Sequence, residues 1–251
     1  MKKIPVWPTL ATLGNLICGF SSLAATAGGN LERAAWLVMV AMLFDAADGR
    51  LARITRTATE FGGQLDSLAD IVSFGVAPAF LTYYSTMSRL TSFSVKFAWT
   101  ASGLYVLCAA MRLARFNVEN TSDASDHRSF KGLPSPAAAG LIASAVILLN
   151  SFETSLPKAV VAFLPVVEIL VAVLMVTKLR YPHILNQLDL GDRPFSFLLL
   201  VVFLGMLVAI AHEIGLFILF AVYAASGPIG LTIDQVLERL AAASDSEDSL
   251  F

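Results

Sequence analysis

The chain has 251 residues, of which 57% are hydrophobic and only 14% are charged, and its mean hydropathy is +0.73. An ordinary soluble domain carries roughly 25% charged residues, so this composition excludes one and predicts an integral membrane protein. The formal net charge is −2, and the basic residues form no stripe along the sequence. We therefore expect no nucleic-acid partner.

Apolar runs of about 20 residues divide the chain into expected transmembrane helices. Their ranges are Leu10–Ala27, Ala34–Arg53, Leu65–Met87, Val95–Arg115, Pro134–Phe152, Pro157–Val176, Pro194–Ala211 and Ile214–Ile233. Only a thin polar break at His212 and Glu213 separates the last two. We predict an all-α polytopic membrane protein with about eight transmembrane helices. Residues 1–235 would form one membrane-embedded domain, and residues 236–251 a short, acidic, disordered cytoplasmic tail.

The basic residues indicate how these spans are oriented. With the N-terminus inside, thirteen of the seventeen Lys and Arg residues fall on the cytoplasmic side, and the exceptions are Arg33, Arg89, Lys96 and Lys158. Cytoplasmic loops of membrane proteins carry such an excess of positive charge. The bias predicts a multi-pass protein of the inner cell membrane whose acidic stretch faces the cytoplasm.

Four aspartates lie where the second expected span ends and the third begins. Asp45 and Asp48 are three residues apart, and Asp66 and Asp70 are four apart, so each pair points from one face of a helix. A short loop joins the two spans, which makes them antiparallel neighbours. Charge persists at membrane depth mainly when it is paired, metal-bound or in a water-filled cavity. Four carboxylates predict a site for Mg²⁺ or Mn²⁺ that would bind a substrate phosphate. We expect two ions, because two metal ions together clamp an in-line phosphoryl displacement.

Other readings of these acids are a cation-coupled transporter and a purely structural scaffold. A single Asp near a helix end is ordinarily a cap. Here, however, small residues and an arginine lie between the acids: Gly49, Gly62 and Arg53. Glycines let a ligand approach the backbone, and a guanidinium binds phosphate in bidentate fashion, so this pattern favours a diphosphate site.

The spaced pattern Asp-x2-Asp-Gly-x2-Ala-Arg-x8-Gly-x3-Asp-x3-Asp, from Asp45 to Asp70, resembles the signature of the CDP-alcohol phosphatidyltransferase family. The resemblance implies that Asp45, Asp48 and Asp66 bind divalent metal, with Asp70 as a further ligand and the general base. It also implies that the CDP part of CDP-diacylglycerol contacts Asn15, Gly49, Arg53 and Thr59. Homodimers are usual in the family, and the small residues at 137–140 are suited to close helix packing.

Four further segments, residues 12–20, 66–79, 114–117 and 131–136, are similar to the bacterial phosphatidylserine synthases of that family. This likeness implies transfer of the phosphatidyl group from CDP-diacylglycerol to L-serine, giving phosphatidylserine and CMP, by metal-assisted in-line attack of the serine hydroxyl. The carboxylate of serine needs a cation, and the candidates for this subsite are Arg112, Arg115, Asn117 and Lys131. Glycerol 3-phosphate, an inositol phosphate or choline are alternative acceptors, and these basic residues are alternatively lipid-headgroup anchors.

Two features lie outside this pattern. Glu168 falls inside an expected span without an evident partner, and we expect a basic group on a neighbouring helix to meet it. Cys18 and Cys108 lie in apolar stretches with no spacing typical of a disulfide framework or a zinc site, which predicts free thiols.

Overall fold

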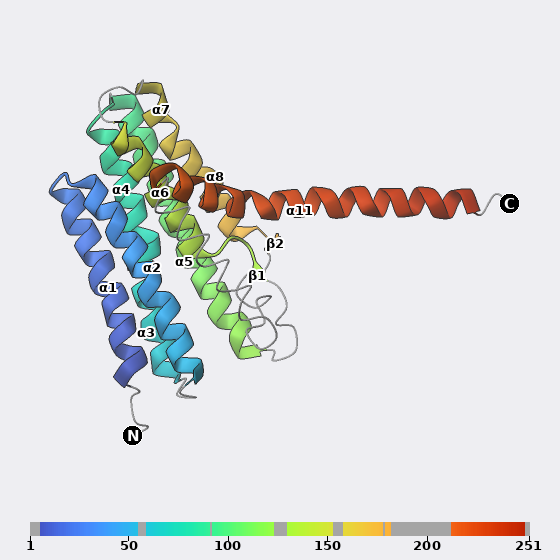
Figure 1. Cartoon of the computed structure of the whole chain (residues 1–251), viewed down its shortest axis with the longest axis horizontal. Helices are drawn as coiled ribbons and strands as arrows, with labels where there is room; N and C mark the ends of the chain where they lie inside the picture. Colours follow the sequence, from blue (N-terminus) through green and yellow to red (C-terminus); the bar gives the residue numbers. More distant parts are fainter. Residues whose placement is uncertain are drawn as a thin grey trace.

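A computed structural model describes residues 6–54, 59–90, 92–122, 130–152, 158–177, 179–181 and 212–248. This part of the chain is helical apart from one short strand pair (Figure 1). The helices are α1 (Val6–Ala27), α2 (Leu31–Ile54), α3 (Glu60–Asp70), the π-helix η1 (Ile71–Val76), α4 (Ala77–Met87), α5 (Ser92–Ser122), α6 (Ser135–Ser151), α7 (Lys158–Ala162), α8 (Leu164–Val176) and α11 (His212–Asp248). Strand β1 (Phe130–Lys131) pairs antiparallel with β2 (Arg180–Tyr181).

The helices run up and down in a bundle around α6. Helix α1 packs along α2, and α5 packs along α8 (Figure 1). In α6, 13 of 17 residues are buried, many of them alanine, because small side chains let neighbouring helices approach closely. The segment at 137–140 is therefore inside this chain: a Cβ on Gly140 would lie 2.7 Å from Phe220 Cδ1 of α11. These residues pack within the chain, and so they are not the free packing surface that the sequence suggested.

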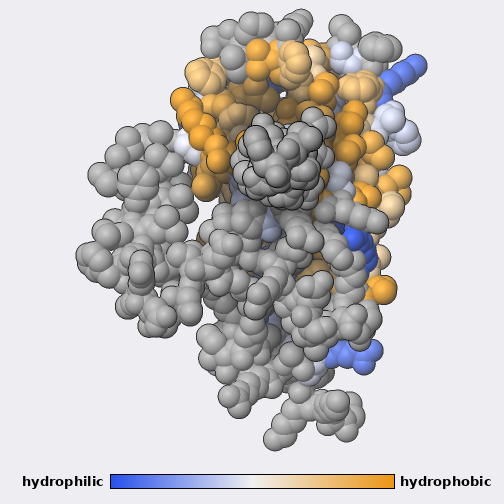
Figure 2. Space-filling view, turned by 90° about the vertical axis from the view of Figure 1, so that its right-hand side faces the viewer, coloured by the Kyte–Doolittle hydropathy of each residue, from blue (hydrophilic) through white to orange (hydrophobic). Residues whose placement is uncertain are grey.

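Within the part of the chain that the structure describes, four helices are long and apolar enough to cross a membrane. They are Val6–Ala27, Glu60–Met87, Ser94–Val118 and Glu213–Thr232, and Ser135–Ser151 and Val160–Val176 are shorter apolar helices. Large apolar side chains are exposed along them, for instance Trp7, Ile17 and Phe20 of α1. Figure 2 shows apolar side chains gathered over the upper part of the described surface on one face. The prediction of an all-α polytopic membrane protein is confirmed, while the expected span at 194–211 lies outside the described residues.

Helix α11 begins at His212, at the polar break noted in the sequence, and extends beyond the bundle (Figure 1). It continues to Asp248, so residues 236–248, which we expected to be disordered, are helical. Leu, Glu, Arg and Ala dominate the first part of this segment, and these residues have high helix propensity. Cys18 and Cys108 are free thiols, as predicted.

One end of the bundle brings α2 and α3 together. Helix α2 ends at Ile54, and α3 begins after Thr59, whose Oγ1 accepts a hydrogen bond of 3.0 Å from the Gly62 N–H. Such an N-cap satisfies a backbone donor that the first turn leaves free. Helices α3, η1 and α4 then form one continuous run, and both α3 and η1 pack on α1. The two acidic pairs therefore lie on adjacent helices within one bundle.

Candidate metal centre and active site

Three of the four aspartates converge into one group. Asp45 and Asp48 extend from α2 and Asp66 from α3, and one carboxylate oxygen of each lies within 4.8 Å of the others. Asp48 is buried, with 6% of its surface exposed, and the other two are half-buried. The spacing of three residues on α2 places its two acids on one helix face, as the sequence predicted.

The donor set of this group suits a divalent cation. Asp48 Oδ2 and Asp66 Oδ1 are buried and make no hydrogen bond. The two carboxyls also lie against each other, and the charges of Asp45 and Asp48 both act on Asp66. Acids this close repel one another when ionised, and a bound cation removes the repulsion. Three carboxylates without His or Cys match Mg²⁺ or Mn²⁺, which prefer hard oxygen ligands and leave positions open for substrate phosphate.

Asp70 lies one turn beyond Asp66 and beside this group. It is 8% exposed, and its charge interacts with Asp45, Asp66 and Asp48. Its Oδ1 accepts a hydrogen bond of 3.0 Å from Asn15 Nδ2 in α1. Asp70 thus has a partner on another helix that orients its carboxylate.

The residues predicted to contact CDP are spread around this group. Asn15 is fully buried against Asp70, and its Oδ1 makes no hydrogen bond. Gly49 directly follows Asp48 in α2, and Thr59 caps α3. Arg53 is in the last turn of α2, and its side chain lies outside the described residues. The CDP contacts of all four remain predictions.

Arg112 is the predicted acceptor residue that faces the acids. Its charge interacts with both Asp70 and Asp45. Its Nη1 donates a hydrogen bond of 2.7 Å to Ser135 Oγ at the start of α6, and its Nε is buried without a partner. Ser135 was not among the predicted site residues, although a hydroxyl between Pro134 and Pro136 at the start of an apolar helix was a usable signal.

The remaining predicted acceptor residues are less clearly directed at the acids. Asn117 exchanges hydrogen bonds with Ser67, which is adjacent to Asp66, at 2.9 and 3.2 Å. Arg115 is half-buried one turn after Arg112 on α5. Lys131 is in strand β1, and its side chain lies outside the described residues. Asn117 is thereby linked to α3, next to Asp66.

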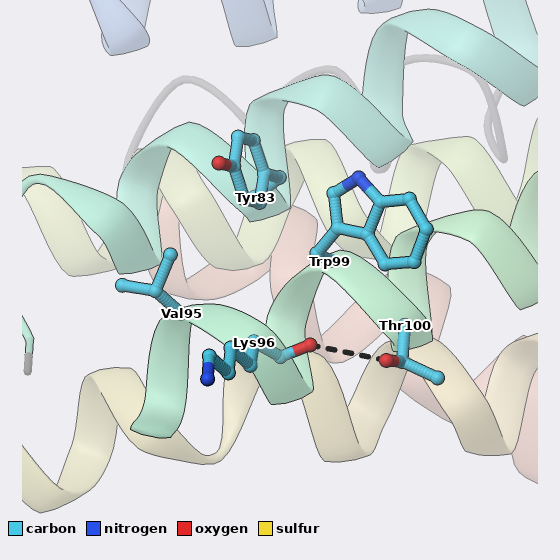
Figure 3. A pocket seen from close by; sticks show the side chains of 5 residues that line it. All are labelled: Tyr83, Val95, Lys96, Trp99 and Thr100. Carbon is cyan, nitrogen blue, oxygen red and sulfur yellow. Dashed lines mark hydrogen bonds between the residues drawn. The ribbon is translucent and has the colours of Figure 1, made fainter. Parts of the chain in front are cut away.

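A separate open pocket of about 380 Å³ lies between α4 and α5. It is lined by Tyr83, Val95, Lys96, Trp99 and Thr100, and the Thr100 hydroxyl donates to the Lys96 carbonyl (Figure 3). None of the predicted site residues lines it. Tyr and Trp gather where membrane helices meet the interface, so we interpret this pocket as part of an aromatic belt.

Comparison with known proteins places the chain in a class. The profile of the CDP-alcohol phosphatidyltransferase family matches residues 5–177, and the chain belongs to this family of membrane transferases. It is 34% identical over 228 residues to the CDP-diacylglycerol–serine O-phosphatidyltransferase of Helicobacter pylori, covering 88% of this chain and 92% of that protein. It is 32% identical over 224 residues to the enzyme of the same name from Methanocaldococcus jannaschii, covering 89% and 94%. It is also 36% identical over 180 residues to the archaetidylserine synthase of Methanothermobacter thermautotrophicus, covering 70% of each chain.

Proposed function

We propose that this protein transfers the phosphatidyl group of CDP-diacylglycerol to L-serine and releases CMP. The group formed by Asp45, Asp48 and Asp66 carries the proposal, because converging carboxylates with unpartnered buried oxygens suit a cation that would hold a diphosphate. The names of the relatives support the donor and the acceptor. We also propose that the site faces the cytoplasm at the inner membrane, on the charge bias of the loops, and that the protein is a homodimer, as is usual in the family.

In this proposal the donor lies with its acyl chains in lipid and its diphosphate at the three clustered aspartates. A divalent cation held there would neutralise the diphosphate and the charge that develops on departing CMP. Gly49 leaves room beside the acids for the nucleotide, and Arg53, Thr59 and Asn15 complete the CDP contacts. The carboxylates thus favour a donor whose phosphates can bind the same divalent cation.

The transfer itself needs a base. Asp70 takes the proton of the serine hydroxyl, and the serine oxygen forms a new bond to the phosphorus that carries diacylglycerol. The bond from that phosphorus to the oxygen bridging the two phosphates breaks, and CMP leaves with the electron pair. The hydrogen bond from Asn15 Nδ2 directs one oxygen of Asp70 and leaves the other for this proton.

Serine as the acceptor rests on Arg112. The charge of its guanidinium interacts with Asp70 and Asp45, and its Nη1 donates a hydrogen bond to Ser135. The buried, unpartnered Nε leaves a donor for a carboxylate. Asn117, Arg115 and Lys131 would form the outer part of the same subsite. One partly buried arginine matches one carboxylate better than it matches the doubly charged phosphate of a phosphorylated acceptor.

An acceptor series tests this proposal. The purified protein is given CDP-diacylglycerol, Mn²⁺ and one labelled alcohol at a time: serine, glycerol 3-phosphate, inositol phosphate or choline. We expect labelled lipid and stoichiometric CMP only with serine, and a loss of about 10² to 10⁴ in kcat in Asp70→Asn. Product with glycerol 3-phosphate but not serine would overturn the acceptor. CMP release that does not depend on any acceptor, or full activity in Asp70→Asn, would overturn the mechanism.

A further inference from the structure

The helix that carries Asp66 and Asp70 changes its winding directly after Asp70. The Ile71 N–H still donates to Ser67, four residues back, whereas the Ala77 N–H donates to Val72, five residues back. Six residues, Ile71–Val76, are wound as the π-helix η1. One residue added to a turn rotates everything after it by about 100° relative to an unbroken α-helix. The turn lets the acids of α3 face the site while the residues of α4 face the bundle core.

A π-helical turn is rare and needs support from its surroundings. Helix α1 supplies the first support. Ser73 Oγ donates a hydrogen bond of 2.9 Å to the Asn15 carbonyl, and both residues are fully buried. Gly19, one turn after Asn15, lies directly against the turn: a Cβ there would be 2.8 Å from Ser73 Cα. The absence of a side chain at Gly19 therefore allows contact between the two backbones.

Helix α5 supplies the second support from another side. The Tyr105 hydroxyl donates a hydrogen bond of 2.9 Å to the Phe74 carbonyl, and both residues are fully buried. Two consecutive residues of the turn, Ser73 and Phe74, are therefore hydrogen-bonded to two different helices, α1 and α5.

The same helix α1 also holds Asp70. The side chain of Asn15 donates to Asp70, while the carbonyl of Asn15 accepts from Ser73. The carboxylate and the turn behind it are therefore fixed to one residue. We propose that Ser73, Gly19 and Tyr105 form a latch, here called the η1 latch, that sets the position of Asp70 for proton transfer. These are positioning residues, and the inference rests on the proposed function of Asp70 as the base.

Ser73→Ala and Tyr105→Phe test the latch from opposite sides. Each removes one hydroxyl and adds no atom. Displacing a reacting group by about 1 Å can cost on the order of 10² in rate, so we expect kcat to fall about tenfold or more in each. The KM for CDP-diacylglycerol and the Mn²⁺ concentration for half-maximal rate should stay within about twofold, because the clustered aspartates are untouched.

Ser22→Ala is the matched control. Ser22 is also on α1 and fully buried, and its Oγ donates to a backbone carbonyl of another helix, Ala34, at 2.8 Å. It loses the same kind of bond without touching η1, so its kcat should stay within about twofold of the wild type. Thermal unfolding of all three variants in one detergent measures the structural loss separately.

Equal kcat in Ser73→Ala, Tyr105→Phe and the wild type would overturn the latch, and so would an equal fall in Ser22→Ala. Because the two test variants alter different helices, misfolding of one leaves the other decisive. Full activity in Asp70→Asn would instead overturn the proposed function. The two failures are therefore distinguishable in one set of assays.

Discussion

Two places in this bundle bury carboxyl groups, and they do so in different ways. Glu168 of α8 is fully buried in the core, and its Oε2 accepts a hydrogen bond of 2.9 Å from Ser102 Oγ of α5. The Thr82 side chain lies beside it as well. At the other place, the charges of four aspartates interact with one another. Both places hold buried oxygens without a hydrogen-bond partner: Oε1 of Glu168 at the first, and Asp48 Oδ2 and Asp66 Oδ1 at the second.

The difference separates a structural acid from a site. One carboxyl in the core can be held by hydroxyls of neighbouring helices. Several carboxyls facing each other repel one another when they are ionised, and a hydroxyl such as that of Thr12 beside Asp48 does not remove this repulsion. We expected a basic partner for Glu168, and this was wrong: its partner is the hydroxyl of Ser102, which the rotation of α5 brings opposite α8. A single buried acid that accepts a hydrogen bond from a hydroxyl thus indicates packing, whereas several acids clustered together indicate a candidate cation site.

The most direct test of this difference is to neutralise one acid in the aspartate group and, separately, Glu168. Asp66→Asn should lower the rate of CMP release by about 10³-fold or more, since metal and donor binding both depend on it. Glu168→Gln should change the rate by less than about threefold, because an amide oxygen still accepts from Ser102. A comparable loss in both variants would show that the two places are not functionally distinct.

A second prediction concerns the cation that faces the acids. Arg112→Gln should raise the KM for serine by about 10- to 100-fold, because a hydrogen bond to a charged group contributes about 1.5–3 kcal/mol. The KM for CDP-diacylglycerol should stay within about threefold. Arg89→Gln is the matched control, since Arg89 is also a partly buried arginine that donates to a side-chain oxygen, Asn150 Oδ1, but lies at the α4–α5 end of the bundle. A rise in the serine KM in both variants would contradict a specific role for Arg112.

Much of this account could be predicted from sequence, because it depends on local periodicity. Runs of apolar residues predicted the helices, and spacings of three and four predicted that Asp45 and Asp48 would share one face and Asp66 and Asp70 another. The short loop expected between the second and third spans was enough to predict that Asp66 lies near the acids of α2.

The rest depends on contacts between distant parts of the chain. Asn15 and Asp70 are 55 positions apart, and Arg112 and Ser135 are 23 apart, so their pairing follows from how whole helices rotate against each other. The π-helical turn after Asp70 left no periodic signal, because it changes the hydrogen-bond pattern of a continuous helix over only six residues. Thr59 was assigned to CDP, and its role as the cap of α3 needed the helix boundary to be known.

A third, smaller effect concerns stability at the structural acid. Ser102→Ala should lower the free energy of unfolding by about 1–3 kcal/mol, since it leaves Glu168 buried without its donor. Glu168→Gln should cost less, because the hydrogen bond is kept. Ser151→Ala, an exposed serine whose hydroxyl donates to the Leu148 carbonyl, is the control and should change little. Unfolding in detergent by denaturant measures all three, and equal losses would contradict the assignment.

The smallest expected effect is at the cap of α3. Thr59→Ala should lower stability by about 1 kcal/mol, and Thr59→Ser should restore it, because either hydroxyl can accept from the Gly62 N–H. If Thr59 also contacts CDP, Thr59→Ala will raise the KM for CDP-diacylglycerol beyond what its loss of stability explains. An unchanged KM in Thr59→Ala would leave it as a cap alone.

The central claim is that the clustered aspartates hold a divalent cation while Glu168 does not. Titration of the purified protein with Mn²⁺, followed by the electron paramagnetic resonance signal of the free ion, tests it without any substrate. We predict saturable binding in the wild type and in Glu168→Gln, and at least a tenfold weaker affinity in Asp48→Asn and in Asp66→Asn. Equal Mn²⁺ affinity in the wild type and both aspartate variants would contradict the account.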